Sequence, residues 1–129
     1  MANEKNDNLT VINTDVQGDV KIADDVVAAI AAIAAAEVDG VGETPAGLGD
    51  TLMAYVGVKK AERGVRVEIA GNIVHVEMKL TVLYGYNIPE VSSKVQEKVK
   101  NSIENMTGLS VAGINIRVSG IEMEKTEEE

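Results

Sequence analysis

The sequence predicts an α+β two-layer sandwich, with two helices on one face of a mainly antiparallel sheet. Three features lead to this class: an alternating β-hairpin, two helices that each offer apolar residues, and a final alternating strand. The hairpin pattern gives the sheet one apolar face, and both helices need such a face to bury their apolar side chains. The most economical packing therefore puts both helices on that face.

The hairpin is the clearest local signal. "VRVEI" at 65–69 and "IVHVEMKLTVL" at 73–83 alternate apolar and polar residues, and "AGN" at 70–72 supplies a tight turn. One face of the hairpin should be buried and the other solvated. The polar residues expected on the solvated face, together with those of the final strand, are Arg66, Glu68, His75, Glu77, Lys79, Asn115 and Arg117.

The first helix is expected at 25–37, after a short strand at 20–22. Asp24 is a suitable N-cap residue, and Gly40 lies near the stop. The helix is rich in alanine and apolar almost all round, which indicates burial on more than one side. Two interpretations stay open: a helix pressed closely on the sheet, and a helix that also forms an oligomer interface.

The second helix is expected at 88–107. Asn87 and Glu90 form a capping-box pattern, Pro89 falls in the first turn, and Gly108 ends the helix. Residues at three- and four-residue steps form one apolar stripe, which consists of Ile88, Val91, Val95, Val99, Ile103 and Met106.

The final strand, at 109–123, changes the phase of its alternation at Gly113 and again at Gly120. A β-bulge at each glycine would keep the apolar residues facing the core. The glycine-containing stretch 39–63 is expected to be a flexible connection, with room for a short strand at 52–58. It lacks the motif spacing of a phosphate-binding loop.

The length of 129 residues favours one domain. We expect a flexible N-terminal segment at 1–17, a single α+β domain at 18–123 and an acidic disordered tail at 124–129.

The formal net charge of −9 argues against binding to nucleic-acid phosphates and against direct docking on anionic lipid. The first ten residues lack the apolar core of a signal peptide. The longest apolar run, 26–36, is shorter than the about 20 residues that span a bilayer. A cytoplasmic protein without direct membrane insertion is therefore expected.

The sequence offers few catalytic groups. It has one histidine and no cysteine, so cysteine-based catalytic and zinc sites are excluded. His75 should lie on the open sheet face, where a surface histidine is a better interpretation than a general base. We expect no enzyme, no metal and no cofactor.

Two of the three tyrosines, Tyr84 and Tyr86, bracket Gly85 just before the second helix. Packing explains the pair best, recognition next and chemistry last. One ring should pack against the base of the helix, and the other should be substantially exposed. The exposed ring would be the better candidate for contact with a partner.

Several segments resemble the alkaline shock protein family, the envelope stress response family of Gram-positive bacteria. The opening "GDVKIADDVVAAIAAIAAAEVDGV" at 18–41 carries part of the resemblance. The most specific motifs follow in the expected order: "YGYNIPEV", Val-Gln-Glu-x-Val at 95–99, "MTGLSV" and "INIRV". The resemblance covers about residues 18–121, and the loop 43–63 matches poorly.

The resemblance implies a small, non-enzymatic cytoplasmic protein linked to cell-envelope homeostasis. Such proteins tend to self-associate, and some reach the membrane through an anchored partner protein. The family supplies no catalytic residues to carry over, and Tyr84, Gly85, Ile88 and Pro89 would belong to its structural signature. We therefore expect a homo-oligomer that docks on a membrane-anchored protein.

A second hypothesis is a small-ligand or RNA binding module that uses the polar sheet face. RNA-binding modules use aromatic side chains and a net positive charge on such a face, and we expect neither there, because the cations alternate with acidic residues. The third hypothesis, an enzyme, is disfavoured by the lack of a catalytic set.

Overall fold

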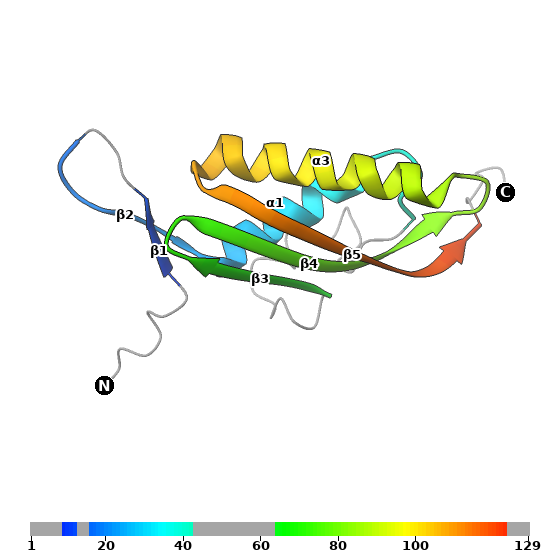
Figure 1. The fold of residues 1–129 in the computed structure, drawn as a ribbon, viewed down its shortest axis with the longest axis horizontal. Coiled ribbons are helices and arrows are strands. Elements are labelled where there is room, and N and C mark those ends of the chain that lie inside the picture. The colour runs from blue at the N-terminus through cyan, green and yellow to red at the C-terminus, as the bar shows by residue number, and fades with distance from the viewer. Residues whose placement is uncertain (1–8, 13–15, 43–63, 124–129) are drawn as a thin grey trace, which may run out of the picture.

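The computed structural model describes residues 9–12, 16–42 and 64–123 (Figure 1). The predicted loop 43–63, the strand at 52–58 within it, and the tail 124–129 lie outside the described residues. In chain order the elements are β1 (Leu9–Ile12), β2 (Val20–Ala23), α1 (Asp24–Ala36), β3 (Val65–Ala70), β4 (Ile73–Leu83), α3 (Ile88–Thr107) and β5 (Ser110–Glu122).

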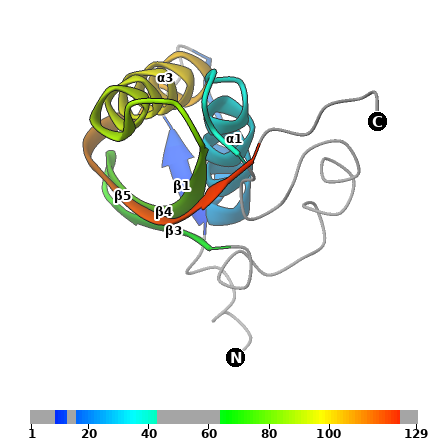
Figure 2. The ribbon, with the colours of Figure 1, turned by 90° about the vertical axis from the view of Figure 1, so that its right-hand side faces the viewer.

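The body of the molecule has two layers, and the predicted α+β sandwich is confirmed. Strands β3, β4 and β5 form one sheet in that order, with β3 antiparallel and β5 parallel to β4. The two helices pack against each other, and they contact the sheet through β3 and β5, respectively (Figure 2). Two of the three strand pairings in the described residues are antiparallel, because β1 also pairs with β2 in that way.

Strands β1 and β2 form a separate ribbon. Strand β1 lies within residues 1–17, for which the sequence predicts flexibility, whereas β2 contains the predicted strand 20–22. Strand β2 leads directly into α1, so the ribbon lies at one end of the body (Figure 1). The division into segment, domain and tail stays a prediction.

The hairpin of β3 and β4 agrees with its pattern. Apolar residues on one face of β4 are buried, and the polar residues His75, Glu77 and Lys79 between them are exposed. The buried set consists of Val74, Val76, Met78, Leu80 and Val82. Gly71 makes the turn at a φ of +65°, a conformation that favours glycine.

Helix α1 begins one residue earlier than predicted, and the prediction that Asp24 is its N-cap is wrong. The N-cap is Ala23, which makes no side-chain capping bond, and Asp24 and Asp25 lie in the first turn. Negative charge is favourable there because of the helix dipole. The alanines Ala32 and Ala35 are buried in the protein's own core, so these side chains are not open to an oligomer interface.

Helix α3 has the predicted bounds and caps. The Glu90 amide donates to Asn87 Oδ1 over 2.9 Å, and Gly108 ends the helix with a φ of +79°. The middle of the apolar stripe is buried, namely Val91, Val95, Val99 and Ile103. Its two end residues, Ile88 and Met106, are exposed, so the stripe is shorter than predicted.

Strand β5 shifts its register against β4 at both predicted places, just before Gly113 and just before Gly120. The first shift keeps Ile114 buried. After the second shift, Ile121 and Met123 are exposed. The prediction that the bulges keep every apolar residue facing the core is therefore wrong at this end, where an edge strand has a neighbour on one side only.

Candidate interaction surfaces

The two tyrosines lie on a tight turn between β4 and α3. The Tyr86 amide donates to the Leu83 carbonyl over 3.2 Å, which closes the turn around Gly85 at a φ of +101°. A positive φ at the third position of a β-turn favours glycine. The Tyr84 amide donates to the Glu122 carbonyl over 2.7 Å, so the turn is tied to the end of β5.

The two rings differ in their surroundings. Tyr84 is 70% exposed, as expected for one ring of the pair. Tyr86 is 43% exposed, so the ring expected to be buried is only half-buried. It lies beside Gly40: a Cβ added to Gly40 would be 2.7 Å from Tyr86 Cδ2 and 2.7 Å from Val91 Cγ2. Only a glycine leaves room for this close approach.

Exposed apolar side chains surround this turn. Ile88 begins α3. Ile121 lies near the end of β5 and Met123 directly follows that strand, at 51% and 73% exposure. The end of β4, the start of α3 and the end of β5 meet at the right-hand end of the molecule in Figure 1. We call Tyr84, Tyr86, Ile88, Ile121 and Met123 the tyrosine end. An exposed apolar group of this kind is typical of interaction sites.

A further set of exposed apolar residues lies on the β1–β2 ribbon: Leu9, Val11 and Val20. An isolated two-stranded ribbon is only marginally stable in water. The residues next to it, 1–8 and 13–15, lie outside the described part of the chain, so we assign no site to this ribbon.

The sheet face opposite the helices is polar, as predicted. Every one of the seven polar residues expected there is exposed, including His75, which lies across from Glu68. Arg66 forms an ion pair with Glu77 over 3.7 Å. Lys79 lies directly across from Arg117. We call Arg66, Lys79 and Arg117 the basic face; with Glu77 and Asn115 they line a hollow of about 520 Å³.

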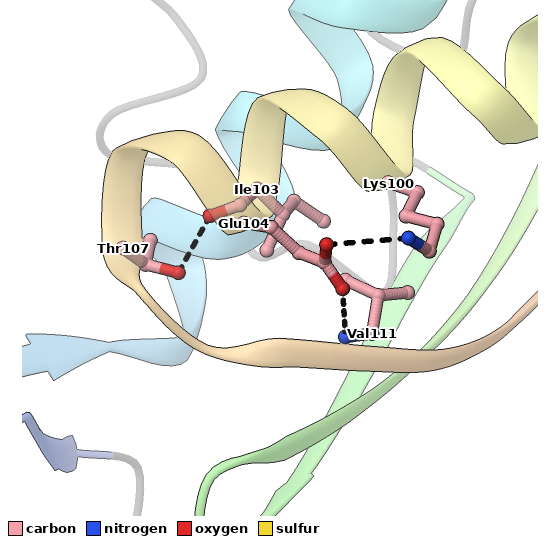
Figure 3. Close-up of polar contacts among 5 residues, drawn as sticks. All are labelled: Lys100, Ile103, Glu104, Thr107 and Val111. Atoms are coloured by element: carbon pink, nitrogen blue, oxygen red, sulfur yellow. Dashed lines mark hydrogen bonds and ion pairs between the residues drawn. The ribbon is translucent and has the colours of Figure 1, made fainter.

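Glu104 fastens α3 to β5 (Figure 3). Its Oε2 accepts from the Val111 amide over 2.9 Å, and its Oε1 accepts from Lys100 Nζ over 3.2 Å. The Val111 hydrogen bond, and then the Lys100 contact, lower the pKa of Glu104 from its usual value. The Thr107 hydroxyl adds a bond to the Ile103 carbonyl in the last turn of the helix.

A shallow groove runs between α3 and β5. It has a volume of about 420 Å³ and is lined by both elements, including Gln96, Lys100 and Ala112. The Gln96 side chain donates to the Ile114 carbonyl over 2.9 Å, so part of the β5 edge is already bonded to the helix. This hydrogen bond links the helix layer to the sheet at the groove.

The described residues contain no group of three or more His, Cys, Asp or Glu side chains arranged to hold a metal ion. In the same ranges, none of the helices has the length and hydropathy needed to cross a membrane.

Fold and surface together define a small two-layer α+β domain with an apolar end and an open, polar sheet face. The model of the alkaline shock protein 23 family, described by its cell envelope-related function, matches residues 12–123. The chain belongs to this family, and the resemblance found in the sequence is confirmed.

The chain is similar to two proteins of Bacillus subtilis strain 168. It is 36% identical to the uncharacterized protein YqhY over 112 residues, which cover 87% of this chain and 83% of that protein. It is 35% identical to the uncharacterized protein YloU over 106 residues, with 81% and 88% covered. The uncharacterized protein Spy1614 of Streptococcus pyogenes serotype M6 is 29% identical over 114 residues, with 87% and 93% covered.

Among solved structures, the zinc form of a MamM CTD variant aligns with a TM-score of 0.47 at 14% identity. The alignment covers 79% of this chain and 90% of that one. The manganese form of another MamM CTD variant gives a TM-score of 0.44 at 13% identity, with 74% and 95% covered.

Proposed function

We propose that this protein is a non-enzymatic interaction protein of the cell envelope stress response, which self-associates and docks on a membrane-anchored partner protein. The family has a cell envelope-related function. The observation that carries the proposal is the tyrosine end, where apolar side chains of a turn, a helix and the end of a strand remain exposed at one end of the fold.

The tyrosine end has the properties of a docking site. Tyr84 presents a large ring on a turn that two backbone hydrogen bonds hold in place, so binding would order little additional chain. Tyrosine is enriched among the residues that dominate binding energies. The neighbouring Ile121 and Met123 would lose apolar surface to water in the same contact.

A protein, rather than lipid, is the proposed membrane partner. The net charge of −9 opposes attraction to an anionic membrane surface. In the sequence, Glu90 and Glu122 flank the exposed apolar residues of the tyrosine end, and no cluster of basic residues adjoins them within the described ranges. These features support a location at the inner face of the membrane that is reached through a partner protein.

Flotation tests this proposal. The purified protein should float with membranes of the cell that produces it, and it should not float with the same membranes after protease treatment. It should also ignore protein-free liposomes, both neutral and anionic. Binding to liposomes at moderate salt would contradict docking through a protein.

The alternative function, a small-ligand or RNA module, is favoured by one observation only, the cations around the hollow of the basic face. The polar face offers no aromatic side chain within the described strands, and such side chains stack the bases in RNA-binding sheets. A bound carboxylate-rich ligand fits these cations better than RNA does, because the protein as a whole repels a polyanion of high charge.

A further inference from the structure

The basic face holds positive charges that the fold does not neutralise. Lys79 and Arg117 lie directly opposite each other on β4 and β5. Like charges at directly opposed positions destabilise a sheet. Within the described residues neither side chain has an ion-pair partner, and the nearby Glu77 is paired with Arg66. Water solvates both positive charges and so reduces their repulsion. An acidic ligand bound beside them would replace this repulsion with attraction.

The local charge also runs against the charge of the chain. Three cations and one carboxylate, Glu77, surround the hollow, which gives a local excess of +2 in a chain of −9. The amide of Asn115 adds a neutral hydrogen-bond donor to the same surface. Two or three carboxylates brought by one short segment would match this set.

The chain itself contains such a segment. Residues 124–129 carry four glutamates and one lysine, a net charge of −3, directly after Met123. Residues 1–8 carry two acids and one lysine, and residues 43–63 carry three acids and three bases. Of the longer segments outside the described residues, 124–129 is the best electrostatic match to the basic face.

The length of the segment 124–129 bears on whether it would bind the basic face of its own chain or that of a second copy. Arg117 lies six residues before Met123 along β5, about 20 Å at 3.3 Å per residue. The glutamates at 127–129 lie four to six residues after Met123 and can extend at most about 14–22 Å from it. Binding within one chain would need the segment to reverse after Met123 and to run back almost fully extended, whereas a second copy can present the same glutamates without that constraint.

We propose that the basic face of one molecule binds the acidic segment 124–129 of a second copy. This inference rests on the self-association in the proposed function and supplies its surface. The contact is head-to-tail, because the face and the segment are different parts of the chain. It is electrostatic and solvent-exposed, so raising the salt from about 0.05 M to 0.5 M should weaken it, as charge screening requires.

The test uses two variants that each remove one half of the contact. Lys79→Glu with Arg117→Glu reverses the face but leaves the segment. Glu124, Glu127, Glu128 and Glu129, all changed to Gln, neutralise the segment but leave the face. Sedimentation at low salt should show each variant at least about tenfold weaker in self-association than the wild type. An equal mixture should restore a one-to-one pair, because each variant supplies the half that the other lacks.

A control variant carries the same change in charge elsewhere. Lys94→Glu with Lys98→Glu changes the net charge by −4, as the face variant does, but on the exposed side of α3, and it should self-associate like the wild type. Circular dichroism and thermal melts check that all variants are folded. Loss of association in the control as well would assign the effect to net charge and overturn the proposal.

The remaining outcomes are also decisive. If both variants associate like the wild type, the face–segment contact is wrong, and the proposed function stands with another surface. If each variant loses association and the mixture does not restore it, the contact between copies is wrong. If the wild type is monomeric at low salt up to about 1 mM, this inference and the self-association in the proposed function both fall, and flotation still tests docking.

Discussion

The tyrosine end and the basic face are both exposed, but for different physical reasons. The polar side chains on the sheet face are exposed because water solvates them better than a core would. No such gain keeps Tyr84, Ile121 and Met123 at the surface, where they lie 51–73% exposed. An exposed apolar end therefore indicates a partner by itself. A charged face indicates one only where like charges lie directly across from each other.

The two surfaces should therefore respond differently to salt. Contacts of the tyrosine end depend on apolar burial, which moderate salt changes little, whereas contacts of the basic face depend on charges that salt screens. A binding activity that survives 0.5 M salt belongs to the first surface on this account, and one that disappears belongs to the second.

The largest effect on stability should come from Gly40→Ala, which breaks the tyrosine end without touching the basic face. Gly40 has a φ of +99°, and the added Cβ would come within 2.7 Å of Tyr86 and of Val91. Backbone strain and overpacking together should lower the free energy of unfolding by about 2 kcal/mol or more. Urea denaturation measures this loss.

Gly71→Ala is the matched control for this substitution. Gly71 also has a positive φ, +65°, but a Cβ there would meet nothing within 4 Å. Gly71→Ala should lower the free energy of unfolding only through backbone strain, by about 1 kcal/mol. Equal losses for the two variants would mean that the close approach of Tyr86 and Val91 contributes nothing.

The next largest effect on stability distinguishes the half-buried Tyr86 from the exposed Tyr84. Tyr86→Ala removes a half-buried ring and should cost about 1–2 kcal/mol, less than the 3–5 kcal/mol typical of aromatic residues in a core. Tyr84→Ala removes an exposed ring and should cost under about 0.5 kcal/mol. Two denaturant titrations decide the matter, and a large loss for Tyr84→Ala would make the pair wholly structural.

The smallest effect concerns Glu104, which joins α3 to β5 and belongs to neither surface. Its pKa is lowered in the folded state, first by the Val111 amide and then by Lys100. The ionised carboxylate therefore stabilises the fold above the usual pKa of 4.5, and this contribution is lost as the pH falls through the lowered value. Glu104→Gln should be less stable than the wild type at pH 7.

The pH profile separates charge from packing in this variant. The difference between Glu104→Gln and the wild type should shrink as the pH falls below about 4.5, since both side chains are then neutral. Glu97→Gln, on the exposed side of the same helix, is the control. A difference that stays constant from pH 7 to pH 3 would contradict a role for the charge.

Local signals predicted α3 and the hairpin well. Asn87, Pro89 and Gly108 each act on the backbone within a few residues, so the bounds of the helix follow from the sequence itself. Alternation likewise assigned the buried and solvated faces of β4. The bounds of α3 and the two faces of β4 are therefore set by residues within or next to each element.

Features that depend on distant parts of the chain could not be predicted in the same way. The pairing of Lys79 with Arg117 arises because β5 lies parallel to β4, and the alternation pattern does not specify a direction. Gly40 could be read only as a helix stop, because its contact with Tyr86 joins segments 46 residues apart. Exposure of Ile121 depends likewise on its place at the end of an edge strand.

Quantitative flotation with native membranes at about 0.5 M salt tests whether the tyrosine end docks on a membrane-anchored protein. Tyr84→Ala combined with Ile121→Ala should weaken binding by about 30-fold or more, the effect of losing about 2 kcal/mol at an interface hot spot. Met106→Ala, which removes an exposed apolar side chain at the other end of α3, should bind like the wild type. Full binding by the double variant, with Met106→Ala unchanged, would contradict the account.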